Sequence, residues 1–197
     1  LDRQPRHIEC FDNSNLQGAH PVASCVVFRD GKPARKEYRH FNIKTVEGPD
    51  DYASMREVVF RRYSRLQEEG AELPDLIIAD GGKGQMGIIH EVLEYLGLDI
   101  PVAGLAKNDR HRTSELLCGY PPVLVGIRPT SPLFHFLAHI QEEVHRFAVS
   151  FHRQKRSKAF IHSELEQIEG VGDKTVQTLL RHFRTVEKVR AANIEEL

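Results

Sequence analysis

The sequence contains no tryptophan, two methionines and three cysteines among its 197 residues. The cysteines, Cys10, Cys25 and Cys118, are odd in number and far apart, which excludes a disulfide framework and a cysteine metal site and favours a reducing cytoplasm. No apolar run approaches the length of a membrane span, and no signal peptide opens the chain. A formal net charge of -1 indicates no partner.

What the sequence does contain is ordinary for a globular protein, with 40% apolar and 28% charged residues. The clearest element is the apolar run Leu76–Ala79, which predicts a strand covered by helices on both faces. The run ends at Asp80, two glycines follow, and apolar residues then recur at helical spacing from Met86 to Leu96. A carboxylate at such a strand end is where α/β proteins place chemistry, although Asp80 as a simple helix cap is the alternative.

Three strands are predicted before that run, at residues 7–12, 21–29 and 34–43. Asp30-Gly31 predicts a hairpin between the second and third, and the interrupted alternation between Tyr38 and Phe41 indicates a bulge. A helix over residues 52–66 follows, capped from the Gly48–Asp51 stretch, with Glu57 on its solvent face. Of the two acids in that stretch, Asp51 is expected to cap the helix.

After the helix that follows Asp80, a short strand is predicted at residues 100–106, and a loop with a small hairpin at 107–130. Ser131-Pro132 then predicts the start of a long helix whose apolar stripe extends to Phe151. His145 flanks that stripe beside Gln141 and Ala148, and an ordinary half-buried histidine is the alternative to a functional one.

Three antiparallel strands that lead into strand-helix-strand units are the signature of the ribonuclease H-like fold. In that fold the first and fourth strands lie side by side, so Asp12, which ends the first strand, meets Asp80, and the last helix carries His145 to the same point. Two ionised carboxylates repel each other, and hard oxygen ligands suit Mg²⁺ or Mn²⁺. We therefore expect a two-metal phosphodiester-cleaving site, with Lys83 binding a phosphate at a helix start.

A nucleotide-binding loop is excluded here, because Gly81–Gln85 lacks the Walker spacing and its metal-binding hydroxyl.

The C-terminal part has a different composition. A stretch without acids carries five cations, Arg146, Arg153, Lys155, Arg156 and Lys158. Such a stretch is usually a solvated linker, but it is also suited to binding a phosphate backbone. A short helix from Ser163 to Ile168, the turn Gly170-Val171-Gly172 and a helix over 173–183 with Lys174 in its first turn predict a helix-hairpin-helix element. Its backbone N–H groups would hold a phosphate without reading bases; plain packing of two helices around a glycine turn is the alternative.

Four stretches together resemble the C-terminal half of UvrC, the nuclease subunit of bacterial nucleotide excision repair. They are Ile8–Asp12, Gly48–Met55, Asp80–Gln85 and His145–Ala148. The resemblance implies an Asp-Asp-His endonuclease site, incision on the 5′ side of a DNA lesion, and action on a complex of damaged double-stranded DNA with UvrB. The chain departs from the family at Asn13–Leu16, and it lacks the N-terminal nuclease half, the UvrB-binding segment and most of the second helix-hairpin-helix motif.

The sequence therefore predicts an α/β, ribonuclease H-like mixed sheet flanked by helices, followed by a small all-α segment. The expected parts are an endonuclease domain at residues 1–154, a basic linker at 155–162 and a helix-hairpin-helix segment at 163–197. Asp12, Asp80 and His145 are the expected catalytic residues and ligands of Mg²⁺ or Mn²⁺. The expected DNA-binding residues are Lys83, Arg146, Arg153, Lys155, Arg156, Lys158, Gly170, Val171, Gly172 and Lys174. A DNA-binding module without catalysis remains open as a second class of function.

Overall fold

The computed structural model describes residues 4–14, 22–46, 48, 50–107, 113–166, 168 and 170–193. Within these ranges it describes only the backbone of residues 14, 107, 113–114, 152–164, 166, 173 and 186–187. The chain divides into two compact units, residues 1–149 and 150–197, which are described separately. No helix among the described residues is long and apolar enough to cross a membrane.

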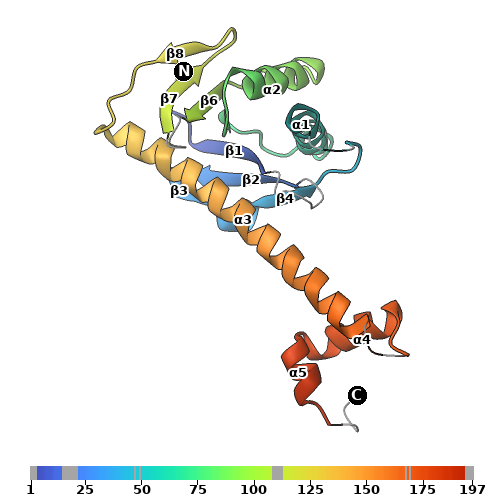
Figure 1. The fold of residues 1–197 in the computed structure, drawn as a ribbon. Helices are drawn as coiled ribbons and strands as arrows, with labels where there is room; N and C mark the ends of the chain where they lie inside the picture. Colours follow the sequence, from blue (N-terminus) through green and yellow to red (C-terminus); the bar gives the residue numbers. More distant parts are fainter. Residues whose placement is uncertain are drawn as a thin grey trace. The chain divides into compact units, whose positions relative to one another are not determined.

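The first unit is built on a mixed sheet of eight strands (Figure 1). In order across the sheet these are β3 (Lys32–Pro33), β2 (Val22–Arg29), β1 (His7–Ser14), β5 (Leu76–Ala79), β6 (Val102–Lys107), β7 (Thr113–Cys118) and β8 (Val123–Val125), while β4 (Arg39–Asn42) pairs with β2. The β1–β5 and β5–β6 pairs are parallel, and the others are antiparallel. The predicted ribonuclease H-like arrangement, with the first strand beside the one that ends at Asp80, is confirmed.

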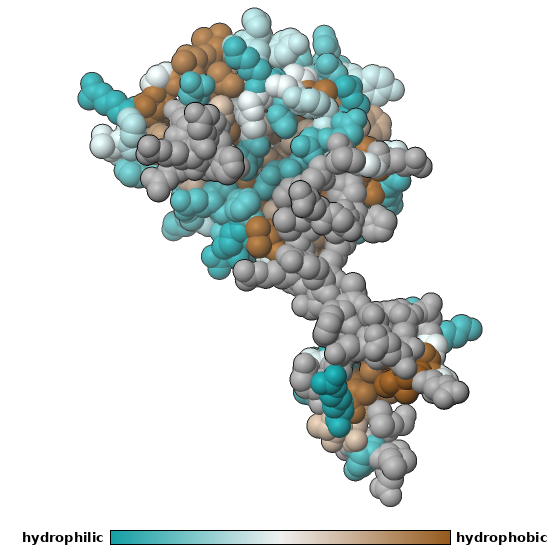
Figure 2. All heavy atoms as spheres, viewed as in Figure 1, coloured by the Kyte–Doolittle hydropathy of each residue, from teal (hydrophilic) through white to brown (hydrophobic). Residues whose placement is uncertain are grey.

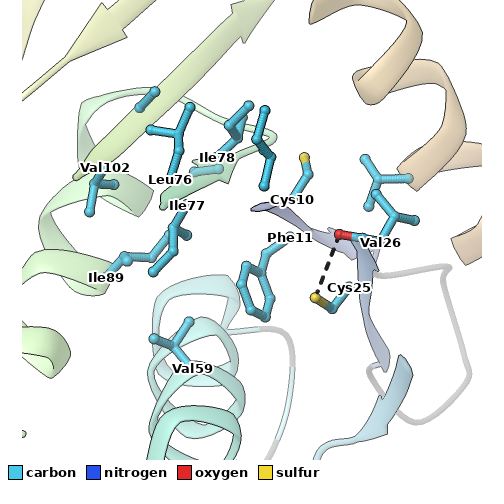
Figure 3. Packing of buried hydrophobic residues seen from close by; sticks show 14 of the residues in the cluster. Cys10, Phe11, Cys25, Val26, Val59, Leu76, Ile77, Ile78, Ile89 and Val102 are labelled. Atoms are coloured by element: carbon cyan, nitrogen blue, oxygen red, sulfur yellow. Dashed lines mark hydrogen bonds between the residues drawn. The ribbon is translucent and has the colours of Figure 1, made fainter. Parts of the chain in front are cut away.

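Helices cover both faces of this sheet. Helices α1 (Asp51–Glu68) and α2 (Lys83–Tyr95) pack on one face, where Phe11 meets Tyr63 of α1 in an edge-to-face contact with ring centroids 6.1 Å apart. Figure 3 shows Phe11 pointing toward Val59 of α1 from this face. The first part of α3 (Pro132–Glu166) packs on the other face, where Phe28 meets Phe136. Because side chains alternate along a strand, β1 presents Phe11 to one layer and Asp12 to the other.

Most of the predicted local signals are confirmed. Asp30 and Gly31 form the hairpin turn with positive φ values of 50° and 76°, a conformation that glycine adopts without steric cost. Ser131 Oγ accepts the N–H of Phe134 at 3.1 Å and so caps α3. The predicted third strand is interrupted instead of bulged: a 3₁₀ turn, η1 (Arg35–Glu37), separates β3 from β4.

The predictions for α1 need two corrections. Asp50 caps this helix, accepting the N–H of Ala53 at 2.9 Å, while Asp51 is the first helical residue. Glu57 does not face solvent: its side chain is 7% exposed and accepts hydrogen bonds from the backbone N–H groups of Lys44 and Thr45. These bonds tie the segment after β4 to α1, a long-range contact that helical periodicity does not encode.

Glu9 of β1 is buried beneath α1 with a cation. Its side chain is fully buried, Arg62 donates two hydrogen bonds to it, and Tyr63 Oη donates a third at 2.9 Å. Burial raises the pKa of Glu9, but the hydrogen bonds from Arg62, His7 and Tyr63 outweigh burial and lower the pKa to about 2. The carboxylate therefore stays ionised inside the core and fixes how α1 lies on β1.

The second unit is helical. Helix α3 continues to Glu166, so the separate short helix predicted from Ser163 is wrong, and residues 155–162 of the predicted linker are helical. Helices α4 (Asp173–Phe183) and α5 (Val186–Ala191) follow. Their small core is formed by Leu165, Val176 and Val189, with Val171, Leu179, Leu180 and Phe183 packed against it. The further helix expected after Asn193 lies outside the described residues.

An apolar edge is exposed on the first unit. Strand β8 ends the sheet, and its three residues, Val123, Leu124 and Val125, are 62%, 57% and 38% exposed. Figure 2 shows hydrophobic atoms gathered where β8 lies in Figure 1. The predicted hairpin of this region is confirmed as the antiparallel pair β7–β8.

Candidate active site

Two carboxylates meet where the parallel pairing of β1 with β5 ends; β5 stops at Ala79, but β1 continues past Asp12 to Ser14, beyond the strand end predicted at residue 12. Phe11 is the register partner of Ala79, and the N–H of Asp80 donates to the carbonyl of Phe11 at 2.8 Å. Asp12 and Asp80 are therefore neighbours across strands that lie about 4.8 Å apart. The structure brings together two residues that the sequence separates by a hairpin, a strand and a helix, as the fold prediction required.

His145 approaches this pair from α3. Its Nδ1 atom lies 3.7 Å from Oδ2 of Asp12, and its side chain is 62% exposed while that of Asp12 is 10% exposed. A ring with that exposure is not core filling, so the ordinary half-buried histidine does not describe it. The imidazole lies beside the carboxylate of Asp12 and is open to solvent.

Asp80 is held from the same helix by Gln141, one turn before His145. The Gln141 side chain is buried and its Nε2 group donates to Oδ1 of Asp80 and, at 3.3 Å, to the carbonyl of Leu105 in β6. Asp80 itself is half-buried. Sequence reasoning placed Gln141 next to His145 but missed this contact; the i, i+4 spacing of the two residues on one helix was the available signal.

The donor set at this point suits a hard divalent cation. Two carboxylates on adjacent strands offer oxygen atoms, and an imidazole at the edge offers a nitrogen. Among the residues that the structure describes, no three histidine, cysteine or acidic side chains form a preassembled metal cluster. The ribonuclease H-like nuclease fold suggests a divalent-metal requirement, and Asp12 and Asp80 are the residues of this site whose charge fits it.

The predicted cations are distributed unevenly around the site. Lys83 is exposed at the first position of α2, three residues after Asp80. Arg146 lies next to His145, but Glu143 engages it with two hydrogen bonds at 2.7 and 2.8 Å, so a phosphate would compete with a carboxylate for it. Arg153, Lys155, Arg156 and Lys158 are in the second unit's part of α3, and their side chains lie outside the described part of the structure.

The hairpin residues of the second unit are solvent-accessible. Gly170 has a φ of 84°, Val171 is half-buried against the small core, and Gly172 precedes the first residue of α4. Lys174 is exposed in the first turn of α4. Backbone N–H groups at that helix start therefore lie beside an exposed cation, an arrangement that suits a phosphate.

Comparison with known proteins agrees with this architecture. Residues 1–149 match the model of the UvrC RNase H endonuclease domain, and residues 163–197 match a SAM-like helix-hairpin-helix tandem. The UvrABC system protein C of Bacteroides fragilis is 59% identical over 197 residues, and that of Bacteroides thetaiotaomicron is 58% identical over 198. Both alignments cover 100% of this chain and 32% of the relative, so the chain spans about a third of their length.

The similarity to solved structures is weak. The crystal structure of human ENDOV is 11% identical, with a TM-score of 0.41, over 79% of this chain and 86% of that one. The family match covers the whole first unit, including both carboxylates and the part of α3 that carries His145. This chain belongs to the UvrC RNase H endonuclease domain family, with a helix-hairpin-helix segment following that domain.

Proposed function

We propose that this chain is the part of a UvrC protein that cuts DNA in nucleotide excision repair, making the 5′ incision beside a lesion. The observation that carries the proposal is the meeting of Asp12 and Asp80 where the β1–β5 pairing ends, with His145 Nδ1 3.7 Å from Asp12. Family membership over residues 1–149 supports the same reaction class. The free cysteines Cys10, Cys25 and Cys118 suit a reducing cytoplasm, where bacterial chromosomal DNA is found.

Each residue of the site has a distinct proposed role. Asp12 and Asp80 hold Mg²⁺ or Mn²⁺, in the two-ion arrangement expected for a phosphodiester-cleaving carboxylate pair. A bound divalent cation would activate a water for attack on phosphorus and stabilise the leaving oxygen. His145 completes the ligand set or contacts the scissile phosphate, and Lys83 with the α2 N-terminus attracts a neighbouring phosphate.

Substrate and partner follow from the same proposal. The second unit holds the DNA backbone through the Gly170–Gly172 turn, Lys174 and the basic stretch of α3, in contacts that would go to phosphates. The expected substrate is damaged double-stranded DNA presented with UvrB. Because the chain spans 32% of the relatives' length, incision is best assayed in a complete UvrC protein that carries these residues.

Metal removal and loss of His145 are the direct test of this function. We expect incision in Mg²⁺ or Mn²⁺ but none in a chelator, and we expect His145→Ala to reduce incision by more than about tenfold. The imidazole is 62% exposed, so the variant should lose less than about 0.5 kcal/mol of stability. Incision of a lesion-containing duplex and thermal unfolding are measured on the same preparations.

His135→Ala is the matched control, because His135 is an exposed histidine of the same helix, ten residues before His145. It should leave both incision and melting unchanged. Incision that persists in chelator, or a His145→Ala protein that cuts normally, contradicts the catalytic assignment. Retained DNA binding with no cutting under any metal condition would instead identify a DNA-binding module.

DNA binding should depend on the hairpin of the second unit more than on the acidic site. An alanine at Gly170, where φ is 84°, strains the backbone by about 1–2 kcal/mol, which corresponds to a loss of roughly 5- to 30-fold in duplex affinity if the turn shifts. Wild-type affinity should fall linearly on a log–log plot against salt, because bound phosphates release counterions. Fluorescence anisotropy of a labelled duplex measures the affinity of each protein and its dependence on salt.

The control for Gly170→Ala is Gly97→Ala. Gly97 also has a positive φ, 67°, and open space around its Cα, but it lies after α2 in the first unit. It should carry a similar strain without an effect on affinity. Equal affinities for Gly170→Ala and wild-type protein, or binding that is independent of salt, would refute this role of the turn.

A further inference from the structure

Gln141 is a buried, neutral residue of the site that contacts one of its two carboxylates. The residue is 5% exposed, and its Nε2 group makes two hydrogen bonds, to Asp80 Oδ1 and to the carbonyl of Leu105. An amide NH₂ has two hydrogens, and both acceptors here require a donor. The NH₂ end of the amide therefore faces Asp80, and not its oxygen.

The donor is neutral, and this matters at a site built to hold a cation. An arginine or lysine in the same place would neutralise Asp80 and compete with a metal ion for it. An amide N–H instead fixes the carboxylate while leaving its full negative charge. With Oδ1 bonded to Gln141, the rotamer of Asp80 is held before any ligand arrives.

The second bond anchors the amide itself. Leu105 lies in β6, the neighbour of β5, and its side chain is fully buried, so its carbonyl is a rigid acceptor. Gln141 thus connects three elements, the end of β5, the middle of β6 and α3. His145 stands one turn further along α3 and meets Asp12 of β1. A single helical turn therefore contacts both carboxylates of the pair.

We propose that Gln141 is a positioning residue that pre-orients Asp80 for divalent-metal binding. It does not touch the metal or the DNA; it acts through the carboxylate. Partners that orient a metal ligand in this way typically contribute about 10- to 100-fold to metal affinity. The inference rests on the proposed metal-dependent nuclease function, whose own failure is distinguishable in the experiment below.

The test is metal binding by the 197-residue chain without DNA. Gln141→Met keeps the length and volume of the side chain but removes the donor. We expect the dissociation constant for Mn²⁺, followed through the electron paramagnetic resonance signal of the free ion, to rise by about 10-fold or more. In a complete UvrC protein, the half-saturating metal concentration for incision should rise in parallel, and saturating metal should restore much of the rate.

Gln67→Met is the matched control. Gln67 of α1 also donates from Nε2 to a backbone carbonyl, that of Leu96 at 3.1 Å, but it is exposed and makes no contact with either carboxylate. Its Mn²⁺ affinity should equal that of the unsubstituted chain. Melting temperatures are recorded for all three proteins, so that a general loss of stability is separated from a local loss of metal affinity.

The possible outcomes distinguish the positioning role of Gln141 from the proposed metal-dependent nuclease function. A Gln141→Met chain with a lower melting temperature, but with a Mn²⁺ dissociation constant within about twofold of the wild-type value, would show that Gln141 only stabilises the fold. That result overturns the positioning role. If the unsubstituted chain itself binds no Mn²⁺ and the complete protein needs no metal for incision, the proposed function fails instead. Weaker Mn²⁺ binding by Gln141→Met alone supports the inference.

Discussion

Replacing Asp80 with asparagine is expected to reduce incision by more than about 100-fold and to leave the fold unchanged. The asparagine side chain would have the same shape and could still accept the hydrogen bond from Gln141, but it lacks the negative charge that holds a divalent cation. Even residues that only orient metal ligands contribute about 10- to 100-fold, so loss of a ligand should exceed that range. The measurement is incision of a lesion-containing duplex by the complete protein with UvrB, in Mg²⁺ and in Mn²⁺.

Asp99→Asn serves as the control for this substitution. Asp99 is exposed after α2, and replacing it makes the same change of charge away from the carboxylate pair. The free energy of unfolding of both variants should stay within about 1 kcal/mol of the wild-type value, because neither variant loses a buried ion pair. Incision at the wild-type rate by Asp80→Asn would remove Asp80 from the site, and equal losses in the two variants would indicate a general effect of charge.

Replacing Arg62 with methionine is expected to produce the largest loss of stability, about 3–5 kcal/mol. Methionine retains most of the apolar contacts, but the Glu9 carboxylate, which is fully buried, loses the cation that compensates its charge. Removing one partner of a buried pair costs more than removing both, so adding Glu9→Gln to Arg62→Met should recover a large part of the loss. Chemical denaturation at neutral pH measures all three free energies of unfolding.

The pH dependence has a definite sign. Folding lowers the pKa of Glu9 from its ordinary value of 4.5 to about 2, so the associated stability is present above the ordinary value and is lost as pH falls toward 2. The difference between wild type and Arg62→Met should therefore shrink in that acid range, where Glu9 becomes neutral. Arg65→Met is the control: its pair with Glu69 is exposed at 76% and 50%, and its loss should stay within about 0.5 kcal/mol. A difference that is small at neutral pH, or constant with pH, would contradict the buried-pair account.

Several elements were determined by the sequence alone, and each has a local cause. The short apolar run Leu76–Ala79, ended by Asp80 and two glycines, favours a buried strand, and Asp30-Gly31 forms the hairpin because that turn requires positive φ. Ser131-Pro132 starts α3 for an equally local reason, a side-chain cap followed by a residue whose φ is already helical. Once those elements are in order, the fold class follows, and with it the meeting of Asp12 and Asp80.

Other features depended on contacts between residues far apart in the chain. Helical periodicity placed Glu57 toward solvent, yet the returning chain after β4 supplies N–H groups that cover it. A helix stop was expected before Ser163, a favourable cap, but α3 continues through it to Glu166. Local preferences of this kind are worth about a kilocalorie per mole, and tertiary packing exceeds them.

Some features of the candidate site could likewise be predicted from the sequence, and others could not. The residues proposed for the site were chosen from local patterns, namely acids expected at strand ends and a histidine beside an apolar stripe, and their catalytic role stays a prediction. Only the tertiary structure showed that Gln141 holds Asp80 and that Glu143 occupies Arg146. A hydrogen bond depends on distances of a few tenths of an ångström between side chains on different elements, whereas spacing along the chain specifies only which face of an element a residue is on.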